Sequence, residues 1–202
     1  MPLTDRGFCT MNWKMKRCLI FIVLLAAMRS ATFPAIHIEA GVLFGTRSVN
    51  NTDIKAVYGS GTVFFPYAAV HLWKGFFVGV GYEGGYSRSG KIGIYKEPTT
   101  LKVTGMEVFV GYQFSVDMVS PFLRAGYGSY SFKQVIDSPF HTEDGVDKTQ
   151  GTVTLAGGLK LFLTGHFFLA GEVRYVPLKV MPYKVEVDLG GMRFTAGMGL
   201  KF

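Results

Sequence analysis

Apolar and polar residues alternate without a break along the last segment of the chain, from Met192 to Phe202. Even positions are all apolar, whereas odd positions carry a charge, a hydroxyl group or no side chain. A period of two predicts a β-strand whose two faces meet different surroundings. A strand of about ten residues, tilted near 45°, crosses the hydrocarbon core of a bilayer. The segment is therefore predicted to be a membrane-crossing strand that ends on an aromatic residue.

The same alternation recurs, with local irregularities, in seven further segments separated by turn signals. The eight predicted strands are Ile36–Arg47, Tyr58–Trp73, Phe76–Ser87, Thr99–Ser115, Ser120–Gln134, Gln150–Leu163, His166–Leu178 and Met192–Phe202. In the fourth segment the apolar phase changes between Val103 and Met106, which predicts a bulge near Gly105. The pattern favours one antiparallel all-β domain without a linker.

The connections between these segments alternate in length. The short ones are Lys74-Gly75, Val116–Val119 and Thr164-Gly165, and the long ones are Ser48–Val57, Arg88–Pro98, Val135–Thr149 and Lys179–Gly190. An even number of strands with short turns on one side and long loops on the other is typical of a bacterial transmembrane barrel. Both termini then lie on the short-turn side, which is the periplasm, and the four long loops are extracellular.

The polar face of the strands separates a membrane barrel from a soluble one. A soluble, lipocalin-like barrel turns apolar residues inward and polar residues to water. Here the polar face is mostly glycine, alanine and threonine with isolated charges, which suits the crowded interior of a narrow barrel. Aromatic residues near the strand ends predict two interfacial girdles: Phe76, Tyr112, Phe114, Phe167 and Phe202 at one end, and Tyr86, Tyr127 and Tyr175 at the other. The apolar face is therefore predicted to meet lipid.

Residues 1–31 are predicted to be a cleavable leader, followed by the barrel at 32–202. Basic residues precede an apolar run that is too short to span a membrane, and small residues follow it: Lys14, Lys16, Arg17, then Cys18–Met28, then Ser30 and Ala31. The alternative is an uncleaved anchor helix. We expect cleavage between Ala27 and Ala35, and a true start at Met11 or Met15, with residues 1–10 as an extension.

The leader also explains the basic balance of the chain. Residues 1–31 hold five basic residues against one acid, so the formal charge of +7 falls to +3 for residues 32–202. The basic pI is therefore no sign of nucleic-acid binding. Both cysteines, Cys9 and Cys18, lie in the leader, so we expect the barrel to have no disulfide, thiolate chemistry or cysteine metal site.

With its leader, eight two-faced strands, asymmetric loops and terminal Gly199-Leu200-Lys201-Phe202, the chain resembles the small outer-membrane barrels of the OmpA-domain and OmpX class. The resemblance covers residues 36–202 and concerns architecture, with no catalytic motif. It implies that the barrel-assembly machinery recognises Phe202, and that outer-membrane lipid and lipopolysaccharide surround the barrel. It also implies a bacterial outer-membrane location. We expect a monomer, with no cofactor and no metal.

By phase, a set of charged residues points into the predicted barrel: Glu39, Glu83, Glu107, Glu172, Arg124, Lys160, Arg174, Arg193 and Lys201. His37, His71 and Gln113 share that phase. Isolated buried charges cost several kcal/mol each, so these groups are expected to pair. We predict a Glu172–Arg193 pair, a contact of Arg174 with Glu83 or Glu107, and a lower pair of Glu39 with Lys201 or Arg124.

The loops offer weaker candidates for chemistry. Some small outer-membrane barrels modify lipid A, and the deacylases among them need a serine, a histidine and an acid together. Only His141 lies on the loop side, within Asp137–Asp144, and a loop is a poor place for preorganised catalysis. The acids of this segment do not have calcium-loop spacing and favour a solvated loop. The basic segment Arg88–Pro98 is either a lipopolysaccharide contact or an ordinary polar loop.

Three function classes follow from these predictions. The favoured one is a non-enzymatic outer-membrane barrel whose charged interior is plugged, with a structural or surface-interaction role through its four long loops. An eight-stranded barrel has an interior just wide enough for side chains, which supports the plug. The alternatives are a narrow small-solute channel and a lipid A-modifying enzyme.

Overall fold

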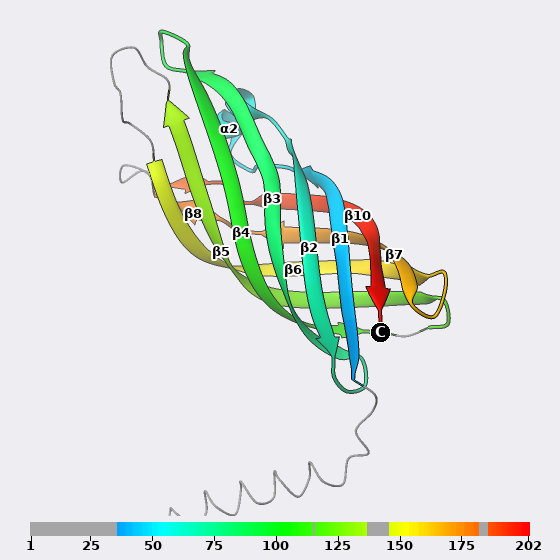
Figure 1. Ribbon diagram of the computed structural model, residues 1–202. Helices are drawn as coiled ribbons and strands as arrows, with labels where there is room; N and C mark the ends of the chain where they lie inside the picture. Colours follow the sequence, from blue (N-terminus) through cyan, green and yellow to red (C-terminus); the bar gives the residue numbers. More distant parts are fainter. Residues whose placement is uncertain (1–35, 115, 137–145, 182–185) are drawn as a thin grey trace, which may run out of the picture. The chain divides into compact units, whose positions relative to one another are not determined.

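The computed structural model describes residues 36–114, 116–136, 146–181 and 186–202. Within these ranges eight long strands close into one antiparallel barrel, in the order β1-β10-β7-β6-β5-β4-β3-β2 (Figure 1). The eight strands are β1 (His37–Arg47), β2 (Gly61–His71), β3 (Phe76–Ile92), β4 (Glu97–Gln113), β5 (Val119–Ile136), β6 (Val146–Phe162), β7 (Phe167–Val176) and β10 (Gly191–Lys201). The predicted up-and-down barrel is confirmed. The predicted leader lies outside the described residues.

The two faces of the strands are divided as the alternation predicts. Outward apolar side chains are largely exposed, among them Met106 at 69%, Val108 at 64% and Leu123 at 62%. The intervening residues Glu107 and Arg124 are buried inside the barrel. An apolar outer surface around a charged interior is the arrangement of a transmembrane barrel and the reverse of a soluble one. No helix within the described ranges is long and apolar enough to span a membrane.

The closing seam between β1 and β10 runs from Glu39 opposite Lys201 to Arg47 opposite Arg193. Glycines allow the two strands to approach closely there. A Cβ placed at Gly45 would strike the carbonyl oxygen of Phe194, and one at Gly197 would strike that of Val42. At the short-turn end, Ile38 and Phe202 exchange two backbone hydrogen bonds of 2.9 and 2.8 Å, which complete the ring of strands.

Strands β3 to β6 extend beyond the apolar band, and there the polarity of their faces inverts. The inward side chains become apolar, as at Leu101, Val103 and Phe132, whereas outward positions become polar, as at Lys102 and Lys133. The change of apolar phase that we placed near Gly105 is therefore no slip in β4, whose alternation continues throughout. It marks the point where the surroundings of the strands change from lipid to water.

A bulge does occur at this level, but in the neighbouring strand β3. Its register shifts between Glu83 and Tyr86, and Gly85 there has φ +90°. The extra residue turns Tyr86 into the interior, where its side chain is 1% exposed. The prediction that Tyr86 belongs to the same aromatic girdle as Tyr127 and Tyr175 is therefore wrong. Tyr127 and Tyr175, by contrast, are exposed on the outer surface.

Three of the four predicted long loops contain regular structure. The first holds the short helix α2 (Thr52–Tyr58), capped by the Asn51 side chain, so the expected strand start at Tyr58 is wrong. Arg88–Pro98 is mostly strand, with only a tight turn at 93–96 between β3 and β4. The last contains a small hairpin, β8 (Lys179–Val180) and β9 (Val187–Asp188). The loop between β5 and β6 lies largely outside the described residues.

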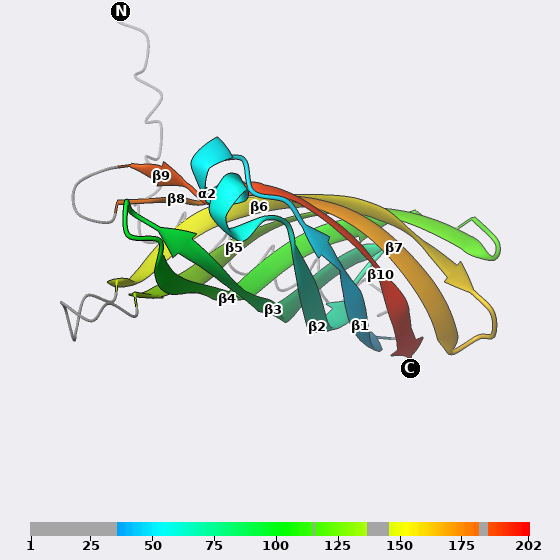
Figure 2. The same cartoon turned by 90° about the horizontal axis from the view of Figure 1, so that it is seen from above.

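These additions form a cap at the long-loop end of the barrel, with α2 and the β8–β9 hairpin at the same end as the β3–β4 turn (Figure 2). Their apolar side chains join those of the extended strands in one cluster: Val49, Tyr58, Tyr86, Leu101, Val103, Tyr130, Phe132, Val146, Val176, Leu178, Val180 and Leu189. The cap therefore has its own hydrophobic core above the charged interior.

Candidate functional site: the charged lumen

The barrel interior holds most of the charged residues that the alternation directed inward. Eight of them are at most 6% exposed: Glu39, Glu83, Glu107, Glu172, Arg124, Lys160, Arg174 and Arg193. Arg47, which the sequence analysis did not include, is 0% exposed. Such groups are tolerated inside a barrel only when they are paired or hydrogen-bonded, so their contacts define the site.

Glu83 of β3 is the centre of the upper part of this network. Its carboxylate lies 2.9 Å from Arg174 of β7, 3.3 Å from Arg193 of β10 and 3.5 Å from Arg47 of β1. The three arginines are neighbours across the sheet, because Arg193 is the register partner of both Arg47 and Arg174. One carboxylate thus bridges three guanidinium groups that would otherwise repel one another.

Arg124 of β5 forms the second centre. Its guanidinium donates two hydrogen bonds, of 2.9 and 2.8 Å, to the two oxygens of Glu172, and a third of 3.2 Å to Glu107. Arg174 joins the two centres, since it also donates to Glu107 at 3.1 Å. Arg174 was predicted to contact Glu83 or Glu107, and it contacts both. Two-point contact between arginine and carboxylate fixes the geometry as well as the charge.

The predicted Glu172–Arg193 pair is wrong, and the register explains why. Glu172 lies opposite Thr195 on β10, while Arg193 lies one inward position further, opposite Arg174. On its other side Glu172 faces Gly158, which has no side chain to fill the space. The side chain of Arg124 reaches Glu172 from the next strand and takes the place we had assigned to Arg193.

Glu39 of β1 organises the lower centre. Its carboxylate accepts hydrogen bonds from the Lys160 ammonium at 2.5 and 2.7 Å and from the Tyr67 hydroxyl at 2.9 Å, and it contacts the His71 ring at 2.8 Å. Lys160 also donates to Gln113 at 3.1 Å. Both predicted partners of Glu39, Lys201 and Arg124, are therefore wrong.

Lys201 is the register partner of Glu39 but does not enter its network. It is only half-buried, at the end of the barrel, and its ammonium lies 5.6 Å from the centre of the Phe162 ring. Water can solvate a cation at this rim, whereas Glu39 already has three other partners. Strand register alone therefore does not determine which charged residues form a pair.

Aromatic rings fill the space between the charges. Arg174 lies 4.0 Å from the centre of the Phe65 ring and Arg124 4.4 Å from that of Phe109, so cation–π contacts supplement the ion pairs. The cavity between the lower centre at Glu39 and the second centre at Arg124 measures only about 10 Å³. A cavity of this size is close to the smallest that can hold one water molecule.

Arg47 is the functional residue that the sequence analysis missed. Its position is in phase with Glu39, and that alternation could have placed it inward. It stands at the last position of β1, where strand phase is a weak guide. Its guanidinium donates to the carbonyl of Leu189 at 2.8 Å, as Arg193 does to that of Gly191 at 2.7 Å. The network is thereby tied to the chain segment that returns from the cap.

The candidates for catalysis and metal binding are not brought together among the described residues. His141 and the acids between Asp137 and Asp144 lie outside them. His37 and His166 contact the carbonyl oxygens of Phe202 and Lys201, at 3.3 and 2.9 Å. Across the described residues, no three histidine, cysteine or acidic side chains are grouped so as to hold a metal ion.

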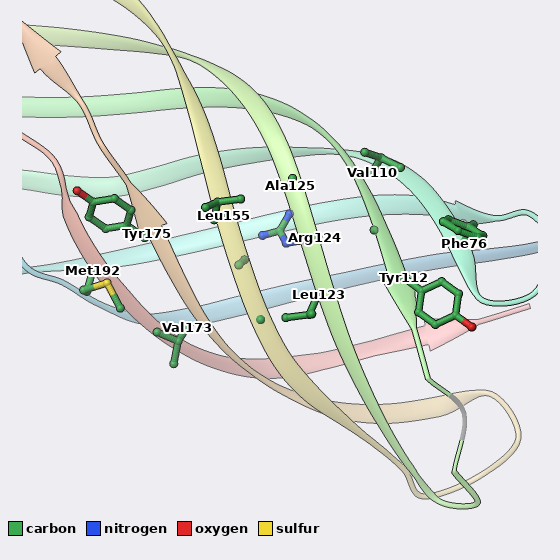
Figure 3. A pocket seen from close by; sticks show the side chains of 13 residues that line it. Phe76, Val110, Tyr112, Leu123, Arg124, Ala125, Leu155, Val173, Tyr175 and Met192 are labelled. Atoms are coloured by element: carbon green, nitrogen blue, oxygen red, sulfur yellow. The ribbon is translucent and has the colours of Figure 1, made fainter.

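Larger concavities lie at the short-turn end and on the outer surface of the described barrel. A pocket of about 430 Å³ opens at the short-turn end, beside His37, His166 and Lys201. A shallow groove of about 600 Å³ runs over the outer surface, between apolar side chains such as Leu123, Leu155 and Val173 (Figure 3). The groove is part of the lipid-facing band. It is therefore suited to contact with acyl chains in the same way as the rest of that band.

A closed barrel with an apolar outer band and a charged interior defines the class of small transmembrane β-barrels. The chain belongs to the outer membrane protein beta-barrel domain family, whose model matches residues 18–202. This membership places the protein in the bacterial outer membrane. No curated protein sequence matches the chain.

Solved structures of small outer-membrane barrels share this fold. The outer membrane protein OprG of Pseudomonas aeruginosa is 12% identical, with a TM-score of 0.61 over 84% of this chain and 97% of that one. Neisserial surface protein A is 18% identical, with a TM-score of 0.55 over 85% and 100%. The N-terminal barrel of Pseudomonas aeruginosa OprF is 14% identical, with a TM-score of 0.54 over 83% and 96%. At these identities the likeness concerns the fold alone.

Proposed function

We propose that the protein is a closed, non-enzymatic platform in the outer membrane, which presents its packed cap for contacts at the cell surface. The observation that carries this proposal is the filled interior: two layers of buried ion pairs lie beneath an apolar cluster. In this arrangement the termini are periplasmic and the cap is extracellular. The proposal includes that the protein acts as a monomer.

The surface of the cap supports an interaction role. Ile94 and Tyr95, at the tip of the long β3–β4 hairpin, are 95% and 82% exposed. They lie well beyond the apolar band, so lipid contact does not explain them. Large apolar side chains exposed at a loop tip are suited to burial against a partner surface. The described cap therefore combines a packed base with an apolar tip.

Conductance measurements test the closed interior. Protein refolded into planar bilayers should give no steady single-channel steps, and Glu172→Gln should not create any. Steady steps in the wild type that disappear in Glu172→Gln would refute the plug and favour the narrow channel. Adhesion assays test the tip. Cells that carry Ile94→Ser/Tyr95→Ser should adhere to other cells less than wild-type cells do, and equal adhesion would contradict a role of the tip.

A separate assay tests the absence of enzymatic activity. Hexa-acylated lipid A, incubated with the purified barrel, should keep its mass. Acyl loss detected by mass spectrometry, and absent from a heat-denatured sample, would replace the platform by a lipid A-modifying enzyme.

A further inference from the structure

Two lysines face each other on the outer surface of the extended strands. Lys102 of β4 and Lys133 of β5 are direct register partners, and both side chains are exposed. Like charges directly opposite each other destabilise a sheet. In the described parts of the chain neither ammonium has an ion pair or a side-chain hydrogen bond. The fold therefore gains nothing from this pair, which suggests that an anion from outside compensates for the repulsion.

The residues around the pair are suited to binding a phosphate group. Ser87 lies opposite Lys102 on one side, and Asp147 lies opposite Lys133 on the other. Hydroxyl groups from Thr100, Thr104 and Ser131 occupy the neighbouring outward positions. The Ser131 hydroxyl donates to Asp147 at 3.5 Å, and that of Thr100 is hydrogen-bonded to Ser89 at 3.2 Å. The row thus offers two ammonium groups and the hydroxyl groups of Ser87 and Thr104 against one carboxylate. Lysine binds phosphate as a point charge, and hydroxyl groups add hydrogen bonds.

The height of the pair identifies the source of the phosphate. Met106 is the last apolar outward residue of β4, and Lys102 lies four residues further along the strand. Four residues span about 13 Å, or about 9 Å along the membrane normal at a tilt of 45°. The headgroup layer is about 5–8 Å thick on each side of the hydrocarbon core, and lysine side chains extend several ångströms back toward it.

We propose that Lys102 and Lys133 form a binding site for the phosphate groups of lipopolysaccharide in the outer leaflet. The proposal rests on the extracellular orientation of the cap given above. It assigns a role to the polar outer face of β4 and β5, which a closed platform alone does not require. The basic segment Arg88–Pro98, the earlier candidate for this contact, lies further from the membrane, toward the tip of the hairpin.

The test uses the refolded barrel in detergent micelles at low ionic strength, with purified bisphosphorylated lipopolysaccharide as the probe. Each of Lys102→Gln and Lys133→Gln should weaken binding about fivefold, and the double variant about thirtyfold. The matched control, Lys55→Gln/Lys96→Gln, removes the same charge from exposed positions on α2 and in the β3–β4 turn. It should change the affinity less than twofold. Enzymatically dephosphorylated lipopolysaccharide should bind the wild type and the double variant alike.

Several outcomes would overturn the proposal. These are an unchanged affinity in the double variant, an equal loss in the control variant, or full displacement of lipopolysaccharide by inorganic phosphate at matched ionic strength. The last outcome would make free phosphate the ligand. Unboiled gel mobility confirms that each variant is folded before it is scored. Binding in micelles is independent of conductance, so an open barrel would refute the closed platform and leave this site intact.

Discussion

Replacing Glu83 by glutamine should destabilise the barrel more than any surface change of the same size. The substitution removes the negative charge that Arg174, Arg193 and Arg47 share at 2.9, 3.3 and 3.5 Å. Removing one partner of a buried ion pair costs about 3–5 kcal/mol, because the other charge stays buried. Arg174 keeps Glu107 as a partner, so the penalty falls mainly on Arg193 and Arg47.

Reversible urea unfolding in lipid vesicles measures this effect. Glu83→Gln should lower the free energy of unfolding by about 3–5 kcal/mol. The control is Glu186→Gln, which removes the exposed 2.7 Å pair with Lys179 and should leave the free energy of unfolding almost unchanged. Adding Arg47→Met to Glu83→Gln should recover part of the loss, since it removes one uncompensated cation. If Glu83→Gln costs no more than Glu186→Gln, the network does not carry the electrostatic role assigned to it.

Three further predictions concern the seam, the cap and the end of the chain. Gly197→Val should destabilise the barrel by about 1–3 kcal/mol, since a Cβ there meets the carbonyl oxygen of Val42, whereas Gly171→Ala, with open space around it, should be neutral in the same urea titration. Phe132→Ala should loosen the cap core at a cost of about 3–5 kcal/mol, seen as faster amide exchange at α2 with unchanged exchange in β10; uniform acceleration would contradict a separate core. Phe202→Ala should lower the yield of folded protein in cells, where the barrel-assembly machinery is expected to recognise Phe202, but not the yield of refolding in vitro. An equal loss in both would show that Phe202, which stacks on His166, acts through stability alone.

The alternation of side chains predicted the fold and most members of the network, because the direction of each side chain follows from its own strand. Glu107 and Arg124 were placed inward from their own neighbours in the sequence, and both are buried. The pairing of those charges depends on register and on side-chain reach across the lumen. Arg193 therefore binds Glu83, from a strand distant in the sequence, instead of Glu172. No local pattern contains that information.

Other differences arise where the surroundings of a strand change. A single extra residue in β3 reversed the direction of Tyr86, and the sequence could not tell such a bulge from a slip in β4. The apolar residues Leu101 and Val103 signalled the cap core, but they could be interpreted only once the strands were known to leave the membrane. The helix α2 is too short to produce a helical period in the sequence.

The buried charges are distributed unequally between the two halves of the chain. Strands β1 to β4 carry three buried carboxylates, Glu39, Glu83 and Glu107, against Arg47 alone. Strands β5 to β10 carry Arg124, Lys160, Arg174 and Arg193 against Glu172 alone. Each half by itself would take an uncompensated charge of one sign into the membrane. The two halves are therefore electrostatic complements, and stable insertion has to wait until the C-terminal strands have been made and have met the N-terminal ones.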